Sequence, residues 1–304
     1  MKKRPMKTCV GACLALAFVC MDAHASEVVT QADRAWARDA LKQERAVEGT
    51  AASNTVGVLY FRNQTGQPSL DPLRKGLALM LITDLSSVEG LRVVERVRLQ
   101  ALVEELGLGR SGLVSPESAP RVGRLLGANW LVGGDLTAPG PEAAGVDSAV
   151  VDVPKSAAVA TPSASGQLAE FFRVEKELLF GVLKVLKVEL TPAQEKRLRR
   201  PCTQSTSALL ALSRAVDASD EGNYKDAERY YEAAMREDPG VCLAREGVYE
   251  LRKLRVVPPK VSGQQVLNET RSETSKTGGL ASPDEVKPLR TSPTTKVRID
   301  VSVP

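Results

Sequence analysis

Residues 54–136 alternate between short apolar runs rich in β-branched residues and longer segments whose apolar residues recur every three or four positions. The short runs are typical of buried strands, and the longer segments are typical of amphipathic helices. The predicted elements are a strand over 55–61, a helix over 71–88, a strand over 91–95, helices over 97–106 and 115–127, and a strand over 130–132. Strands separated by helices of this length predict an α/β layer with parallel strand pairs.

The next segment predicts an antiparallel extension of that sheet. Residues 146–153 alternate loosely and carry β-branched side chains, and Pro154-Lys155 is expected to turn the chain into a returning strand over 157–164. A long amphipathic helix over 168–188 and a short basic helix over 191–200 follow. The fold class predicted for the α/β region is therefore a mixed sheet with helices.

Three strings, at residues 79–85, 91–96 and 127–136, resemble the periplasmic domain of the CsgG family. That family includes the curli secretion component, the flagellar protein FlgO and the penicillin-binding-protein activator LpoB, and its fold is similar to that of the amino-terminal domain of TolB. The resemblance covers roughly residues 55–190. It implies the fold more specifically than the task, because one scaffold serves different functions in these relatives.

A second pattern lies in the carboxy-terminal third, where six residues have the spacing of a tetratricopeptide repeat. They are Gly222, Tyr224, Ala227, Tyr231, Ala234 and Pro239. In such a repeat the glycine ends the first helix, the small residues allow close helix approach, and the proline stops the second helix. One repeat, here about 208–241, cannot bury its faces alone. Its helices therefore either form a groove for a partner peptide or cap the α/β domain.

The amino terminus has the features of a secretory signal peptide. Lys2, Lys3, Arg4 and Lys7 precede an apolar run from Cys9 to Met21, and Ala23-His24-Ala25 is a small-residue cleavage site. The apolar run is too short to span a membrane as a helix, and no later stretch qualifies. We expect an exported protein that acts in the periplasm or at the outer membrane and has no transmembrane helix in the mature chain.

Charge argues against nucleic acid as a partner. Removal of residues 1–25 leaves 37 basic and 36 acidic residues, from 41 and 37 in the whole chain. A nearly neutral mature chain lacks the basic surface that nucleic-acid binding requires.

Two cysteines, Cys202 and Cys242, remain after removal of the predicted signal. In an oxidising compartment they either form a disulfide or stay as two small buried residues. The disulfide would close a loop of roughly 40 residues and contribute on the order of 4 kcal/mol in the chain-entropy model.

The chain predicts no enzyme. Its one histidine, His24, lies in the signal, so the mature chain has no imidazole for acid–base catalysis or metal binding. Residues 107–112 match G-x-G-x-x-G, but they follow a helix instead of a strand, which favours a helix stop and a loop. We expect no catalytic residue, metal or cofactor. A small polar pocket formed by residues 62–65 with Glu95 and Arg96 at the strand ends is a weaker hypothesis.

The predicted organisation has five parts: a signal peptide over 1–25, a helical lead over 26–53, the α/β domain over 54–190, a helical segment over 191–255 and a flexible tail over 256–304. The tail is rich in Pro, Ser, Thr, Gly and Lys, which predicts disorder. Its last segment, 296–303, alternates strictly and is either a strand that adds to a sheet edge or an unpaired tail.

The predicted function is an envelope scaffold or accessory protein that acts through protein partners in curli-like, flagellar or secretion assembly. The resemblance also allows a ring or another homo-oligomer. One alternative is an activator of a peptidoglycan synthase, of the LpoB type. Another is an outer-membrane secretion pore of the CsgG type, but residues 141–167 leave room for at most one membrane hairpin and contain no aromatic residue.

Overall fold

A computed structural model describes residues 28–44, 54–108, 114–140, 142–241 and 243–257. The helices are α1 (Gln31–Lys42), α2 (Leu73–Ser86), α3 (Arg96–Glu105), α4 (Ala119–Leu125), α5 (Phe171–Val185), α6 (Pro192–Leu198), α7 (Thr206–Asp220), α8 (Tyr224–Glu237) and α9 (Ala244–Lys253), with short 3₁₀ turns at Pro68–Leu70 and Leu168–Glu170. The strands are β1 (Thr55–Val58), β2 (Arg62–Asn63), β3 (Arg92–Val93), β4 (Trp130–Thr137), β5 (Ala143–Asp152), β6 (Ala157–Ala160) and β7 (Ser163–Gln167).

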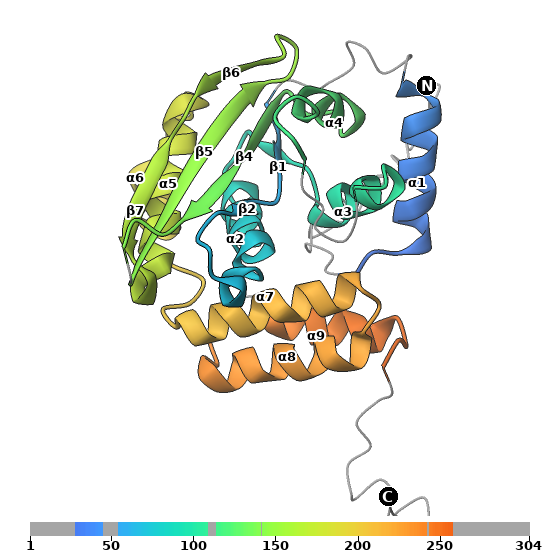
Figure 1. Ribbon diagram of the computed structural model, residues 1–304, viewed down its shortest axis with the longest axis vertical. Coiled ribbons are helices and arrows are strands. Elements are labelled where there is room, and N and C mark those ends of the chain that lie inside the picture. Colours follow the sequence, from blue (N-terminus) through green and yellow to red (C-terminus); the bar gives the residue numbers. More distant parts are fainter. Residues whose placement is uncertain (1–27, 45–53, 109–113, 141, 242, 258–304) are drawn as a thin grey trace, which may run out of the picture. The chain divides into compact units, whose positions relative to one another are not determined.

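The strands form one mixed sheet, which confirms the predicted fold class (Figure 1). Its order is β3-β1-β4-β5-β6, and β2 also pairs with β4 while β7 also pairs with β5. β1 is parallel to both β3 and β4, as expected for strands joined through helices. β4 and β5 are antiparallel, and so are the pairs of β5 with β6 and β7.

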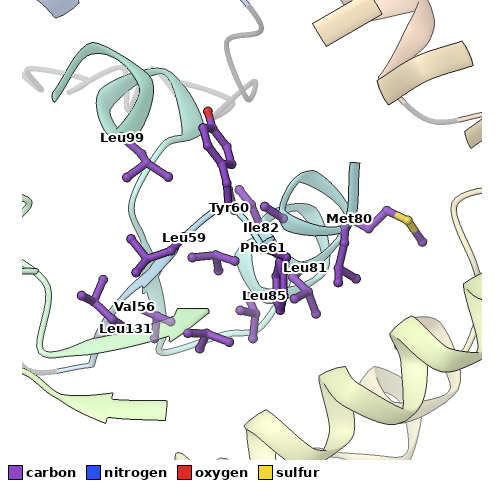
Figure 2. Packing of buried hydrophobic residues seen from close by; sticks show 14 of the residues in the cluster. Val56, Leu59, Tyr60, Phe61, Met80, Leu81, Ile82, Leu85, Leu99 and Leu131 are labelled. Atoms are coloured by element: carbon purple, nitrogen blue, oxygen red, sulfur yellow. The ribbon is translucent and has the colours of Figure 1, made fainter. Parts of the chain in front are cut away.

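Helices cover both faces of this sheet. α2 and α5 contact each other and the strands on one face, whereas α4 packs against β4 and β5 on the opposite face. The chain crosses from β1 to β3 in one direction along the sheet and then from β3 to β4 in the opposite direction. Because both crossovers are right-handed, their helices lie on opposite faces of the sheet. The apolar core lies between the sheet and these helices, and Figure 2 shows Phe61 beside Leu81 and Leu85 of α2.

Helix α2 differs from the expectation of one buried face. Ten of its residues, on all sides of the helix, are buried, because the helix packs against the sheet, α5 and α7 at once. Its start also differs, since the helix begins at Leu73 with Pro72 at the N-cap position, not at residue 71. Asp71 instead accepts a hydrogen bond from Asn63 Nδ2 at 2.7 Å.

The predicted strands are correct in position but not in length. The first strand was expected to continue through residue 61, but β1 ends at Val58. β4 runs five residues beyond its predicted end, since each of its residues pairs with β5. The hairpin at Pro154-Lys155 is confirmed, and the returning segment is divided into β6 and β7.

The carboxy-terminal helices α7 and α8 form an antiparallel pair joined by a short turn. Gly222 in this turn has φ +77°, a conformation that favours glycine. Tyr231 of α8 is fully buried, and its ring leaves no room for a Cβ at Gly247 of α9. These contacts have the geometry expected of a helical repeat unit, but the tetratricopeptide assignment itself stays a prediction.

Several predicted features lie outside the described residues. They are the signal peptide, Cys242, the glycines beyond Leu108 in the G-x-G-x-x-G match, and the tail with its 296–303 strand. Among the helices that the structure describes, none is long and apolar enough to cross a membrane.

Candidate functional site

A buried ion cluster joins the α/β layer to the carboxy-terminal helices. Asp220, at the end of α7, accepts hydrogen bonds from Lys75 Nζ at 2.8 Å and from Arg96 Nη1 at 2.9 and 3.0 Å. The Lys75, Arg96 and Asp220 side chains are only 3%, 1% and 2% exposed. Asp217, one turn earlier on α7, lies 3.1 Å from Lys75 Nζ. Three helices that are distant in sequence, α2, α3 and α7, therefore contribute to one cluster of charges.

The environment of this cluster shifts the pKa of its members. Burial raises the pKa of the Tyr60 hydroxyl to about 12, and Asp220 adds to the rise while Arg96 opposes it. Burial alone would lower the pKa of Lys75, but Asp220, Tyr60 and Asp217 raise it above its usual value. Burial raises the pKa of Asp217, against the lowering effect of Lys75. Lys75 therefore stays charged, and the cluster acts as a structural connection between layers.

A groove on the α4 side of the sheet, with a volume of about 500 Å³, is a candidate binding site. Its floor consists of strand residues, and its walls come from the segment before α4 and from the start of that helix. The lining residues that shape it are Leu59, Arg62, Val114, Pro116, Ala119, Leu131, Gly133, Asp135, Asp147, Ala149, Val151 and Ala158.

Small residues on the strands leave space for the groove above the sheet. Gly133 lies opposite Ala149 on the neighbouring strand, and Leu131 lies opposite Val151 in the same row. Directly opposite residues in antiparallel strands project from the same face of the sheet. Gly134 has φ +157°, and a Cβ there would lie 2.1 Å from the Asp147 backbone oxygen, so the strands approach too closely for any side chain.

One end of the groove carries charge. Arg62 binds Asp135 through two hydrogen bonds, of 2.6 Å from Nε and 2.7 Å from Nη2. Asp147 lies directly opposite Asp135 and is exposed. Two carboxylates facing one guanidinium leave this end with net negative charge. An apolar floor with an acidic end suits a ligand that presents apolar side chains beside a cationic group.

The polar pocket expected from residues 62–65 with Glu95 and Arg96 does not form as predicted. Arg62 lines the groove, whereas Arg96 is buried in the ion cluster next to α7. Asn63 stabilises its own turn by accepting from Thr65 N at 3.0 Å and donating to the Gln67 oxygen. The two strand ends are not brought to one pocket, because α3 begins at Arg96 and directs that side chain inward.

The residues of the tetratricopeptide pattern serve helix packing. Ala227, Tyr231 and Ala234 are fully buried in a second apolar cluster formed by the carboxy-terminal helices. Tyr224 packs against that cluster, while Pro239 is exposed after the end of α8. None of the six lines the groove on the sheet.

Cys202 is disulfide-bonded. Because Cys242 lies outside the described residues, its pairing with Cys202 stays a prediction.

Sequence reasoning missed the buried charges. Lys75 lies between Leu73 and Leu77 in the apolar segment that forms α2. A lysine inside such an apolar segment could have indicated a buried ion pair. Glu175 of α5 is likewise completely buried, next to Lys176, which forms an ion pair with Asp84 of α2. Burial, followed by the charge of Asp84, raises the pKa of Glu175 well above its usual range.

Comparison with known proteins bears on the region that contains the parallel strands and most of the groove lining. Residues 37–145 match the family described as curli production assembly/transport component CsgG. This segment is a CsgG-family domain. The match begins within α1 and ends within β5, so the CsgG-family domain includes the parallel strands, α2, α3 and α4.

Two solved structures are similar to part of the chain. The LpoB C-terminal domain from Salmonella enterica is 14% identical, with 44% of this chain and 94% of that chain covered and a TM-score of 0.31. Lipoprotein GNA1162 from Neisseria meningitidis is 16% identical, with 45% of this chain and 99% of that chain covered and a TM-score of 0.32. A comparison with curated proteins found no match.

Proposed function

We propose that this protein is a non-enzymatic, exported accessory or scaffold protein of the cell envelope. It acts through protein–protein contacts in the assembly of an outer-membrane or surface structure. The observation that carries the proposal is the CsgG-family domain at residues 37–145, since the family is described by its part in curli assembly and transport.

The groove supports contact with a protein partner. Its floor of glycine, alanine and valine is apolar, and its acidic end pairs only partly with Arg62. Protein interfaces of moderate affinity combine an apolar centre with a polar margin in this way. A partner segment with apolar side chains and a lysine or arginine fits both features.

Two further observations from the sequence support export and the absence of catalysis. The amino-terminal segment has the charge and apolar pattern of a signal peptide. Its cleavage would remove His24 and leave no imidazole in the mature chain. The protein would then act by binding, in the periplasm or at the outer membrane.

Cross-linking from the groove in intact cells tests this proposal. A photoreactive amino acid at Ala149, on the groove floor, is expected to cross-link an envelope protein. The same substitution at Ala193, an exposed alanine of α6, is the matched control and is expected to give no such product. Recovery of the protein in the cytoplasmic fraction, or equal cross-linking from both sites, would contradict the proposal.

A further inference from the structure

The outer edge of the sheet consists of β6 and β7, which both pair with β5 on their inner side. In the described part of the chain no strand pairs with their outer side. Figure 1 shows the two strands in succession along β5, with α5 behind the sheet. Together with residues 161 and 162, they form one extended edge segment over 157–167.

This edge has no charged side chain to oppose association, and it is interrupted only by an irregular pairing of β6 opposite Val150 and Val151 and by the proline at position 162. Residues 156–169 contain no charged side chain, and most of them are exposed. Val159 is 46% exposed, so the edge also presents an apolar side chain to solvent. Native edge strands are normally blunted with lysine or other charges, since unpaired backbone groups accept a strand from another molecule. An uncharged edge of this length indicates a surface that another strand covers.

Pro162 does not block the outer side. Its oxygen accepts a hydrogen bond from Ser148 N of β5 at 3.0 Å, and Leu168 N donates to the Glu142 oxygen at 2.8 Å. The backbone N–H and C=O of one strand residue point to the same side. Pro162 therefore lacks its N–H on the inner side, and the alternation leaves Ser163, Ser165 and Gln167 with their backbone groups directed outward.

We propose that a second copy of this chain pairs with this edge in antiparallel fashion, about a two-fold axis near Pro162. The result is one continuous sheet across a homodimer. A two-fold interface places the same surface on both subunits, so an edge can pair with itself only if it does not repel itself. The uncharged sequence of residues 156–169 meets that condition.

Charges at the two ends of the edge favour this occupant and this direction. Lys155 precedes β6, is 74% exposed and pairs with Asp152 at 2.7 Å, and Glu170 follows β7, is 47% exposed and pairs with Arg173 at 2.9 Å. Exposed pairs of this kind are weak, so both charges remain available to a second copy. Antiparallel self-pairing brings the Lys155 end of one copy beside the Glu170 end of the other, and the symmetry produces this attraction twice. Parallel self-pairing would place each charge beside its own kind. Because strand addition alone makes a small interface, the dimer is expected to dissociate on dilution.

The solution mass of the full exported chain, measured by light scattering over a wide range of concentrations without detergent, tests the proposal. The wild-type protein is expected to shift from monomer to dimer as concentration rises. Ser165→Lys introduces into each copy of the edge a lysine, the charge that blunts natural edge strands, and is expected to give a monomer. Ser86→Lys adds the same charge at an exposed position of α2 and is expected to leave the dimer unchanged.

A charge exchange at the ends of the edge makes the test specific for the antiparallel arrangement. Lys155→Glu or Glu170→Lys alone is expected to raise the dimer dissociation constant by about tenfold, and the double variant is expected to restore it. Unchanged circular dichroism would show that each variant is folded. A wild-type monomer at every concentration overturns the proposal, and so does an oligomer whose mass is insensitive to Ser165→Lys.

Discussion

At the scale of single residues, Asp220 is a buried charge on α7 that connects this helix to α2 and α3. It is the shared partner of Lys75 and Arg96, which are almost completely buried. Removal of one member from a buried ion pair leaves an uncompensated charge, and this is more damaging than replacement of the whole cluster by apolar residues. Whether a substitution in this cluster lowers or raises the free energy of unfolding therefore depends on which charged partners remain.

Asp220→Asn is expected to lower the free energy of unfolding by about 3 kcal/mol, because Lys75 and Arg96 lose the buried carboxylate that they share, although Asp217 still faces Lys75. Urea unfolding followed by circular dichroism measures this value. Asp226→Asn is the matched control, because Asp226 on α8 forms an exposed pair with Arg229. Its expected effect is below about 1 kcal/mol. Equal effects of the two substitutions would show that the Asp220 cluster is solvated.

The raised pKa of the buried Glu175 carboxyl leads us to expect an unusual dependence of stability on pH. Burial, then Asp84, raises its pKa in the folded chain well above the ordinary value that it regains on unfolding. The unfolded chain therefore releases this proton at lower pH than the folded chain does. The protonated form of Glu175 therefore favours the folded chain. This contribution to stability is fully present below the pKa of Glu175 in the unfolded chain and is lost as the pH rises through its pKa in the folded chain.

Glu175→Gln removes this titration while keeping the shape of the side chain. The variant is expected to be more stable than wild type at about pH 8, and the difference should shrink by at least about 1 kcal/mol at about pH 4. Chemical unfolding at several pH values measures it. Glu177→Gln, on the exposed side of the same helix, provides the control. A difference that does not vary with pH would exclude a raised pKa at Glu175.

At the scale of elements, the hydrophobic pattern was sufficient for the order and type of the strands and helices. The β-branched runs located β1, β3 and β4, and the turn at Pro154-Lys155 located the hairpin. It was insufficient for α2, whose leucines on several faces carry no information about which helix packs on each face. That information depends on long-range contacts with α5 and α7, which a local pattern does not contain.

The contact between α2 and α7 has almost no spare room at Gly76. A Cβ there would lie 2.0 Å from Ser213 Oγ and 3.1 Å from Ser213 Cβ. Gly76→Ala should therefore lower the free energy of unfolding by about 1–3 kcal/mol, although alanine is the better helix former.

The hydroxyl of Ser213 is the cause of that expected loss, so its removal should reverse much of it. Ser213 Oγ donates to the Leu209 oxygen within its own helix, and Ser213→Ala alone should have a small effect. The double variant Gly76→Ala, Ser213→Ala is expected to recover much of the stability lost in Gly76→Ala. Thermal and urea unfolding of the three variants checks this. A Gly76→Ala protein as stable as wild type would contradict the close packing of α2 on α7.

At the scale of the whole molecule, the sequence predicted the helices and strands more readily than the contacts between distant segments. The groove is lined by residues between positions 59 and 161, and its floor of glycine and alanine has no distinctive local pattern. The ion cluster likewise joins Lys75 and Asp220, which are 145 positions apart. Arg62 was the one predicted polar residue that lines the groove, because strand ends are a general location for ligand sites.

The division into an α/β domain over 54–190 and a helical segment over 191–255 stays a prediction about sequence regions. By contacts, all described residues fall in one compact unit that extends to Pro258. Since Asp220 neutralises Lys75 and Arg96, we expect the two regions to unfold together. In a chain that ends at Val257, tryptophan fluorescence from Trp36 and Trp130 should change at the same urea concentration as circular dichroism.

A chain that ends at Arg200 should be strongly destabilised, because it retains the buried cations without Asp220. Lys75→Met combined with Arg96→Met should recover part of the loss in that shorter chain, since methionine fills similar volume without charge. The same double substitution in the longer chain should be destabilising, because it leaves Asp220 buried and unpaired. Equal stability of the chains ending at Arg200 and Val257 would show that the α/β domain folds independently of α7. Loss of rescue by the methionines would instead assign the coupling to the apolar contact between α2 and α7.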